Sequence, residues 1–489
     1  MRCLKEQIKD HISSEIKNDV LYIKDLMEGN SDLVVREFRF QKLNAALIYI
    51  DGMADKKLLD DYVLESLMGC EEPIKSIYEI KEKILTVSDM REVKKLSEGI
   101  NAMLSGDTLM LLDGLDMAYV IATRAWAARG VGEPASETVI RGAREGFTET
   151  VRFNTALIRR RIRDTRLKMI SKTIGVRSKT DVIIAYIDDI VNKDVLEELK
   201  NRIDKIKIDA IMDSGYIEQM IEDNSLSPFP QIQSTERPDV VAAALYEGRI
   251  AILVDNSPYS IIVPTTLANL FQSPDDYYQR WFSASLIRIV RSFALIISII
   301  LPALYVAVTS FHTAIIPTRL AYSIAASREG VPFPAFVEAL IMEISLWLLL
   351  EAIVRLPRPI GATIGIVGGL IIGQSAVSAG IVSPIMIIIV GVTAITEFMT
   401  PNYEVTLGLR IIRFLILIAS AIIGLYGIIL GLILVLSHLI KLKSFGVPFL
   451  APLVNTEIRD FKDIFVRVPF KYYKERPDYM DTGDKIRQK

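Results

Sequence analysis

Hydrophobic positions are distributed very unevenly along the chain. Up to about residue 280, short apolar runs alternate with charged stretches, whereas long uncharged runs fill residues 292 to 440. A helix of about 20 uncharged residues is long enough to cross a ~30 Å hydrocarbon core. The pattern therefore predicts a soluble half followed by a membrane half, with a boundary near residues 275 to 290.

Three stretches of the second half are typical of membrane-spanning helices: Ser292 to Phe311, Phe333 to Val354 and Phe414 to Ser437. A further uncharged run, 359 to 396, would be about 57 Å long as one helix. We expect it to break, either at Ser383-Pro384 or within the glycines of 368 to 373. The piece 313 to 331 is short and interrupted by charges and proline, so it reads as interfacial or re-entrant.

Charges and aromatic rings indicate the orientation of this half. Its entry combines arginines with aromatic residues, as expected at cytoplasmic headgroup depth: Arg280, Arg288 and Arg291 beside Tyr277, Tyr278, Trp281 and Phe282. The tail beyond residue 440 is also basic, so we place both ends in the cytoplasm. An even number of spans follows, and four or six both fit; with four, Arg410 and Arg413 fall on the outer side.

The soluble half contains one pattern twice. The segment Ala45 to Tyr62 aligns without a gap with Val182 to Leu199, and each reads as a strand ending in Tyr-Ile-Asp, a turn and a charged helix. Leu111 to Ile121 likewise matches Leu253 to Val263. The separations are about 140 residues, which indicates a tandem duplication. Because apolar strands alternate with helical patterns, we expect two lobes of the α/β class.

The predicted organisation is a membrane protein with a cytosolic N-terminal α/β region of two duplicated lobes, a polytopic transmembrane helical domain of four to six spans, and a cytosolic tail. The predicted ranges are 1–30 for an N-terminal helical segment, 31–165 and 166–274 for the lobes, 275–440 for the transmembrane domain and 441–489 for the tail.

Four aspartates follow strands of the two lobes. We consider Asp51, Asp113, Asp188 and Asp255 as candidates to bind a small solute in a cleft between the lobes. Aspartate after a strand also commonly caps the next turn or helix, and the duplication could serve packing between subunits.

Composition limits the remaining classes of function. A formal net charge of −2 argues against a nucleic-acid partner. With Cys3 and Cys70 as the two cysteines and three scattered histidines, we expect neither disulfides nor a metal site. We find no phosphate loop or nucleophile motif and expect neither a cofactor nor an enzyme. The start of the chain has no apolar signal-peptide region.

The uncharged run contains a segment poorly suited to face lipid. Small and polar residues crowd Gly368 to Met386, and the candidates for lining a pore are Gly369, Gly373, Gln374, Val377 and Ser378. Glycine costs helix stability unless something compensates. The alternatives are close helix packing or contact with water.

Glu343 is the sixth candidate for the ion path. Glu338 lies near the start of its helix, and Glu351 is four residues before Arg355, a spacing that suits an ion pair. Glu343 has neither explanation, and a carboxylate at membrane depth is costly unless it is protonated, paired or wet. It either faces a cation path or is a neutral acid bonded to a neighbouring helix, for example to Gln374 or Ser375.

Several motifs together resemble one known family: REGVPFPAFVEALIMEIS, RLPRPIG, IIGQSAVSAGIVSP and SFGVPFLAP, with VIRGAREGFTETVRFNTALIRRRIRDTRLKM in the soluble half. They are similar to the A subunit of the GerA-type spore germination receptors of endospore-forming bacteria. A paralogue in the dipicolinate-channel operon is the rival identity, although RGVGEPASETVIRGAREGF looks more like the nutrient-receptor branch.

The resemblance implies a subunit in the inner spore membrane that works with a transporter-like B subunit and a lipoprotein C subunit. It also implies a homo-oligomer, with a pentamer as the expected form, that acts as a nutrient-gated channel for monovalent cations. A secondary transporter and a non-conducting scaffold or signalling subunit are the alternative functions.

Overall fold

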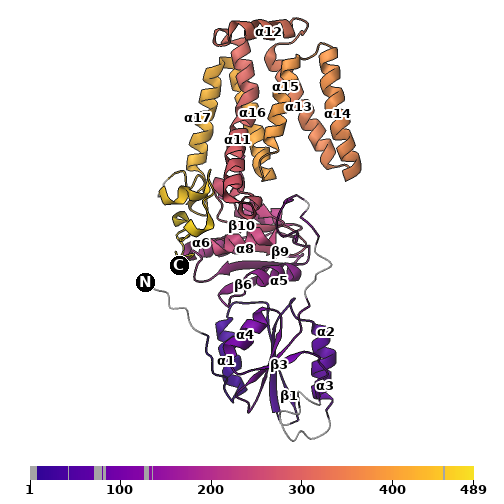
Figure 1. Cartoon of the computed structure of the whole chain (residues 1–489), viewed down its shortest axis with the longest axis vertical. Helices are drawn as coiled ribbons and strands as arrows, with labels where there is room; N and C mark the ends of the chain where they lie inside the picture. Colours follow the sequence, from indigo (N-terminus) through magenta and orange to yellow (C-terminus); the bar gives the residue numbers. More distant parts are fainter. Residues whose placement is uncertain are drawn as a thin grey trace.

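The computed structural model describes residues 8–41, 43–70, 80, 84–125, 132–134, 136–454 and 458–488. Cys3, the start of the predicted N-terminal segment and part of the RGVGEP stretch lie outside the described residues. Two stacked lobes form one end of an elongated molecule, and a group of long helices forms the other (Figure 1).

The first lobe is a five-stranded sheet with the order β1-β2-β4-β5-β3. Its elements are α1 (Ile16–Leu26), β1 (Leu33–Phe40), β2 (Leu43–Ile50), α2 (Lys56–Leu58), a π-turn (Leu59–Leu64), α3 (Glu65–Met68), β3 (Met90–Val93), α4 (Leu96–Leu104), β4 (Thr108–Leu112) and β5 (Ala118–Ile121).

The second lobe has the same arrangement, β6-β7-β9-β10-β8. Its elements are α5 (Val151–Arg161), β6 (Leu167–Ile174), β7 (Thr180–Ile187), α6 (Lys193–Asp204), α7 (Ser214–Ile221), β8 (Gln233–Thr235), α8 (Pro238–Tyr246), β9 (Ile250–Val254) and β10 (Ser260–Val263). Two short helices, α9 (Leu267–Phe271) and α10 (Asp275–Tyr278), then lead into the helical half.

The shared strand order agrees with a repeated unit. All pairings within both sheets are antiparallel, whereas alternating strands and helices commonly indicate a parallel sheet. Neighbours such as β1 and β2 are joined by a short turn, and only antiparallel strands can be joined that way.

Alternation along each central strand supplies apolar side chains to both faces of its sheet. In β2, Ala46, Ile48 and Ile50 pack with α1 and α4. Ala45 and Leu47 pack with α3 and with the π-helical segment Leu59–Leu64. The near-continuous apolar run of this strand thus reflects burial on both faces.

Helix α5 shows where the two lobes meet. It falls within the range predicted for the first lobe, yet its apolar side chains pack on the second sheet, in the place that α1 occupies on the first. The Arg159 side chain of α5 is fully buried and pairs with Asp32 of the first lobe, at 2.7 Å from Nε to Oδ2 and 3.0 Å from Nη2 to Oδ1. A buried ion pair therefore joins the lobes.

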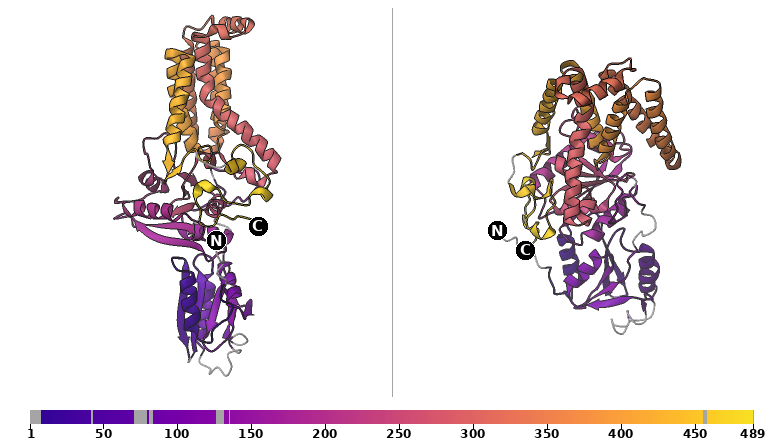
Figure 2. Two further views of the ribbon diagram at one scale, coloured as in Figure 1. Left: turned by 90° about the vertical axis from the view of Figure 1, so that its left-hand side faces the viewer. Right: turned by 45° about the horizontal axis from the view of Figure 1, so that its top comes forward.

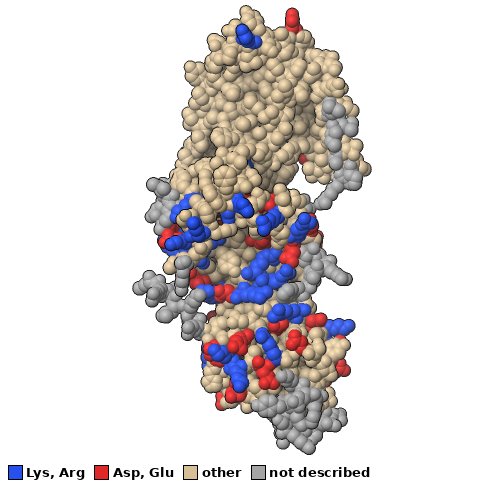
Figure 3. Space-filling model, viewed as in Figure 1, with Lys and Arg blue, Asp and Glu red and all other residues tan. Residues whose placement is uncertain are grey.

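The helical half comprises α11 (Trp281–Ser310), α12 (Thr318–Arg328), α13 (Ala335–Val354), α14 (Arg358–Ser378), α15 (Pro384–Glu397), α16 (Tyr403–Ile423) and α17 (Leu425–Lys441). Helix α12 lies across the end farthest from the lobes, and the others run roughly along the long axis (Figure 1). By length and composition, α11 and α16 could cross a membrane, and α15 and α17 are shorter apolar helices. The face drawn in Figure 3 is nearly free of charge over this half.

One predicted span is wrong. Residues 414 to 437 do not form a single helix, because the chain reverses at Gly424, whose φ is +63°. Beyond this turn, a Cβ at Gly427 would lie 2.2 Å from the Ala419 carbonyl oxygen, so only glycine allows α16 and α17 to approach there.

The tail returns from α17 to the second lobe (Figure 2). It contains β11 (Lys443–Ser444), β12 (Val447–Pro448) and 3-10 turns at Ile458–Asp463, Phe470–Tyr472 and Asp478–Met480. Arg476 donates from Nε to the Tyr246 carbonyl at 2.8 Å, and the Gly483 N–H donates to the Ile190 carbonyl at 3.1 Å. The tail is therefore part of the structure around the second lobe.

Replacing Arg159 with Met should destabilise the full-length chain by about 3–5 kcal/mol, because Asp32 would remain buried without its cation. Unfolding in detergent would measure this loss. The control is Arg177→Met, which breaks an exposed pair with Asp209 and should change stability by about 0.5 kcal/mol or less. Equal effects of the two substitutions would contradict the importance of the buried pair.

Candidate functional site

Four charged side chains meet inside the helical half. Glu343 of α13, Glu397 of α15, and Arg410 and Arg413 of α16 are each at most 6% exposed. Arg413 Nη2 lies 2.9 Å from both Glu343 Oε2 and Glu397 Oε2, and Arg410 donates from Nε to Glu397 Oε1 at 3.0 Å. Because Arg410 and Arg413 are three residues apart, both lie on one face of α16.

This network balances two positive and two negative charges in an apolar bundle. An unpaired charge at this position would lower the stability of the fold, because it would be buried without a counter-charge. Glu343 therefore pairs with Arg413, whereas Gln374 and Ser375, the partners considered from the sequence, are exposed on α14. Arg410 and Arg413 lie inside the bundle, not beyond it as the four-span arrangement required. Hydropathy alone could not identify their partners, which come from two other helices.

The other two carboxylates of α13 have separate roles. Glu338 is fully buried in the first turn, and it accepts hydrogen bonds from the Ser383 N–H at 2.9 Å and from Arg328 Nε at 3.0 Å. It thus holds the start of α15 and the end of α12 against α13. Glu351 forms the predicted ion pair with Arg355, on an exposed surface.

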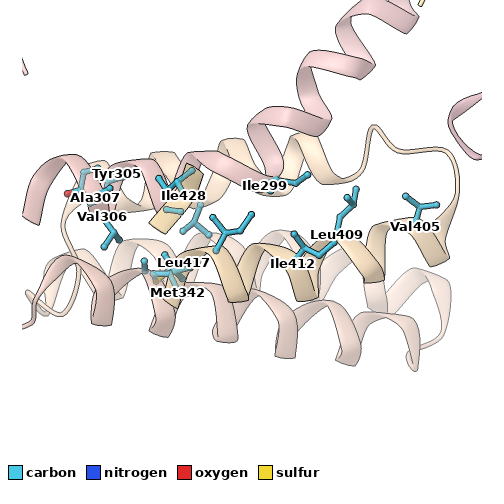
Figure 4. Close-up of a cluster of buried hydrophobic side chains, with 14 of the residues drawn as sticks. Ile299, Tyr305, Val306, Ala307, Met342, Val405, Leu409, Ile412, Leu417 and Ile428 are labelled. Atoms are coloured by element: carbon cyan, nitrogen blue, oxygen red, sulfur yellow. The ribbon is translucent and has the colours of Figure 1, made fainter. Parts of the chain in front are cut away.

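Apolar packing surrounds these polar contacts. Ile299, Val306, Met342, Ile412 and Leu417 belong to one buried cluster shared by α11, α13 and α16 (Figure 4). The cluster extends to Phe449 of the tail and Phe229 of the second lobe. A continuous core therefore connects the helical half with the second lobe.

Helix α14 has one packed side and one exposed side. Cβ atoms at Gly361, Gly365 and Gly368 would lie 2.9–3.3 Å from atoms of α13, so these glycines allow close helix contact. Gln374, Ser375 and Ser378 are exposed. Helix packing thus explains the three glycines that contact α13, but it does not explain the three polar residues, which are exposed.

The predicted pore residues divide accordingly. Gly369, Gln374 and Ser378 are exposed, and among the described residues no other segment has an atom within 4 Å of a Cβ placed at Gly369. Gly373 and Val377 are half-buried, and Val377 packs against the bundle core. Glu343 lies in the ion network instead. The chain breaks before Ser383-Pro384, where Ser383 caps α15, whereas the glycines of 368 to 373 continue α14.

The entry to α11 is also organised by ion pairs. Asp276 is buried and pairs with Arg288 at 2.8 Å and Arg291 at 3.0 Å, and Arg288 also pairs with Asp463 of the tail. These two arginines bind protein carboxylates where headgroup contact was expected. Among the entry aromatics, Trp281 and Phe282 are exposed, whereas the hydroxyls of Tyr277 and Tyr278 donate to Asp463 and Asp239.

The four strand-end aspartates are not brought together. Asp113 accepts from the N–H of Ile16 at the start of α1, and Asp255 accepts from that of Val151 at the start of α5. Asp51 pairs with Lys56, and Asp188 with Lys193. Because β2 and β4 are antiparallel, as are β7 and β9, the two aspartates of each lobe lie at opposite ends of its sheet.

Glu218 and Glu222 of the second lobe lie near Glu404 of α16, and sequence reasoning did not find this acidic region. Glu404 accepts a hydrogen bond from Ser234 at 3.2 Å. Burial and the nearby charges of Glu404, Glu222 and Asp213 raise the pKa of Glu218 to about 8. Within the described ranges, no three His, Cys, Asp or Glu side chains gather as a metal site would require.

Comparison with known proteins identifies extensive similarity. Residues 21–479 match the family model described as Bacillus/Clostridium GerA spore germination protein. The chain is 42% identical over 466 residues to spore germination protein GerLA of Bacillus cereus, covering 94% of this chain and 95% of that protein. It is 42% identical over 487 residues to spore germination protein B1 of Bacillus subtilis, covering 98% and 100%.

A solved structure also matches part of the chain. It is the N-terminal domain of the A subunit of the Bacillus megaterium spore germinant receptor GerK3, with 34% identity and a TM-score of 0.42. The match covers 52% of this chain and 97% of that one.

Arg413→Gln should destabilise the chain in detergent by about 3–5 kcal/mol, because Glu343 loses its cation and Glu397 keeps only Arg410. Glu343→Gln should cost less, since it leaves no unpaired carboxylate. The control Glu351→Gln breaks the exposed pair with Arg355 and should cost at most about 1 kcal/mol. If Arg413→Gln behaves like this control, the network does not hold the helices together.

Glu218 should make stability depend on pH. Its pKa in the folded chain, about 8, exceeds the ordinary value of 4.5, so folding favours the protonated carboxyl. The contribution of Glu218 to the free energy of unfolding is therefore complete below pH 4.5 and is lost as pH rises through 8. Unfolding midpoints between pH 5 and 9 should therefore fall less steeply for Glu218→Gln than for the unaltered chain. The exposed control Glu197→Gln should keep the original slope; parallel curves for all three proteins would refute the assignment.

Proposed function

Because the chain belongs to the GerA family of spore germination proteins, we propose that it is the A subunit of a nutrient germinant receptor that forms an ion channel in the inner spore membrane. Copies of the chain assemble around an axis, with a pentamer as the expected form, and work with a B subunit and a lipoprotein C subunit. Opening releases monovalent cations early in germination.

The exposed polar residues near the end of α14 are the observation that carries this proposal. Gln374, Ser375 and Ser378 are exposed in the single chain, on a helix of a largely apolar helical half. Such residues at membrane depth are favoured against another protein surface or a water-filled path. An assembly that places α14 toward a central axis satisfies them, whereas a lipid-facing α14 does not.

The course of the helices is compatible with six crossings. α11, α13, α14, α15, α16 and α17 follow one another along the long axis, and α12 lies across the far end (Figure 1). The tail returns to the second lobe, so the tail and the lobe lie on the same side of the membrane, which requires an even number of crossings. We take this side as the cytoplasmic side. In this arrangement the network around Glu343 holds the bundle that supports α14.

A non-conducting scaffold is the second candidate, and the contact of Gly361, Gly365 and Gly368 with α13 favours it, because packing alone explains those glycines. Secondary transport is the third. Purified protein in liposomes separates the three functions: a channel gives fast passive flux, a transporter gives saturable coupled flux, and a scaffold gives none.

Cysteines at Gln374 and Ser378 should react with a charged, membrane-impermeant thiol reagent in the assembled protein, on a background in which Cys3 and Cys70 are replaced by serine. Cysteine at Val377 should react more slowly, because Val377 packs against the bundle core. The lipid-side control is Leu434→Cys on α17, a position that is 63% exposed in the single chain and should stay protected by lipid.

Labelling rates in membranes, before and after activation, would measure this difference. Protection of Gln374 and Ser378 equal to that of Leu434 in both states would overturn the pore assignment and leave helix packing as the role of this segment.

A further inference from the structure

The first turns of α11 extend beyond the part of the helix that can cross a membrane. Helix α11 has 30 residues, which gives a length of about 45 Å, whereas a hydrocarbon core is about 30 Å thick. Its uncharged part begins at Ser292 and is by itself about 28 Å long. The preceding turns contain Arg288 and Arg291, so they fall in the headgroup zone on the side of the second lobe. The left-hand view of Figure 2 shows the start of α11 leaning away from the bundle, with part of the tail beside it.

Residues 461 to 472 of the tail, the tail segment, are fixed at the same level. The Arg467 N–H donates to the Ser285 hydroxyl at 3.1 Å, and the same hydroxyl oxygen lies 3.1 Å from the Arg467 carbonyl oxygen. Asp463 pairs with Arg288, at 2.6 Å from Oδ1 to Nη1. The tail segment therefore lies beside the first turns of α11, in the same headgroup zone.

Both elements expose large apolar side chains at this level. On α11 they recur every three or four residues, so they share one face, which continues into the uncharged part of the helix. They are Phe282, Leu286, Val290, Phe293 and Ile297. In the tail segment five such side chains are 41–51% exposed: Phe461, Phe465, Val466, Phe470 and Tyr472. An exposed apolar surface of this kind marks a membrane or protein interface.

Basic side chains accompany this apolar surface. Arg280, Lys462 and Lys471 are exposed, and among the described residues no carboxylate forms an ion pair with any of them. Arg467 is 3% exposed, with Cζ 4.1 Å from the centroid of the Phe470 ring, yet its Nε and Nη2 have no hydrogen-bond partner in the described part of the chain. A buried cation without a counter-charge is unfavourable. This region therefore lacks an anion as well as an apolar cover.

An anionic bilayer surface supplies both. The boundary between headgroups and acyl chains accepts aromatic and aliphatic side chains, and the lipid phosphates attract lysine and arginine. The exposed face of α11 is continuous with the part of the helix that crosses the core. Residues 280 to 291 contain three arginines and no acidic residue, and the carboxylate of the tail segment, Asp463, is already paired. Continuity and charge thus favour the bilayer over a second copy of the chain.

We propose that the tail segment and residues 280 to 291 dock together on the anionic surface of the bilayer. Their aromatic side chains lie at the headgroup boundary, and Arg280, Lys462 and Lys471 bind lipid phosphates. Because the tail also binds the Tyr246 and Ile190 carbonyls of the second lobe, the docked segment fixes the height of that lobe above the membrane. This docking rests on the membrane crossing given in the proposed function, but not on ion conduction.

Fluorescence quenching of the full-length protein in lipid nanodiscs tests the docking. A thiol-reactive fluorophore is attached to Phe465→Cys on a background in which Cys3 and Cys70 are replaced by serine. We expect a nitroxide on the lipid headgroups to quench this label strongly and aqueous iodide to quench it weakly. The matched control is Ile486→Cys, a tail position that is 61% exposed near the C-terminus, which lies beside the second lobe (Figure 1). The order of the two quenchers should be reversed there.

The charge of the lipid provides the second comparison. Headgroup quenching of the Phe465→Cys label should be stronger in nanodiscs of equal parts phosphatidylcholine and phosphatidylglycerol than in phosphatidylcholine alone. Combining Lys462→Gln with Lys471→Gln should reduce this difference at least about twofold, because two of the attracted charges are removed. Lys485→Gln, which alters another exposed lysine of the tail, should leave the difference unchanged.

A label on Leu434→Cys in α17 separates failure of the docking from failure of the membrane crossing. If a nitroxide deep in the acyl chains quenches Leu434→Cys while iodide reaches Phe465→Cys as readily as Ile486→Cys, the docking is wrong and the crossing stands. Shielding of Phe465→Cys from both quenchers would assign the surface to another protein, and headgroup quenching that ignores phosphatidylglycerol would remove the role of charge. Either result would overturn the docking. Without quenching at Leu434→Cys, the crossing and the docking are both wrong.

Discussion

The helical half depends on how two arginines are accommodated in an apolar bundle. Arg410 and Arg413 lie on one face of α16, and their counter-charges come from α13 and α15. Because neither the cations nor the carboxylates can remain unpaired there without a large penalty, the network restricts how the three helices can be arranged. The glycine contacts of α14 with α13 then leave the polar side of α14 outward.

The joint between the soluble and helical halves uses the same physical device. Asp276 and Asp463 neutralise Arg288 and Arg291 at the start of α11, and one of these carboxylates comes from the tail. The second lobe therefore contacts the helices through the connection before α11, through α16 and through the tail. A structural change in that lobe therefore has three routes to the bundle.

The duplicated lobes show how one unit is adapted to two environments. In each, an aspartate after the fourth strand in chain order accepts from the first N–H of the lobe's leading helix. In the first lobe, the loop after β2 contacts α5. In the second lobe, the equivalent loop after β7 contacts the tail. The unit is repeated, but each copy covers a different neighbour.

Much of this organisation follows from the sequence alone. The boundary between charged and uncharged halves, the repeat of strand, turn and helix, the Glu351–Arg355 pair and the break before Pro384 all depend on local composition or spacing. The motifs that resemble the GerA family led to a family assignment that the full-length similarity confirmed.

Long-range pairing was decided only by the tertiary structure. Strand direction placed the aspartates of each lobe at opposite ends of its sheet, although their sequence contexts suggested a common cleft. The reversal at Gly424 depends on a backbone conformation that hydropathy does not encode. The partners of Glu343, Arg410 and Arg413 lie on different helices. A sequence records which charges must be paired, but the chain's path through space determines which partners are within reach.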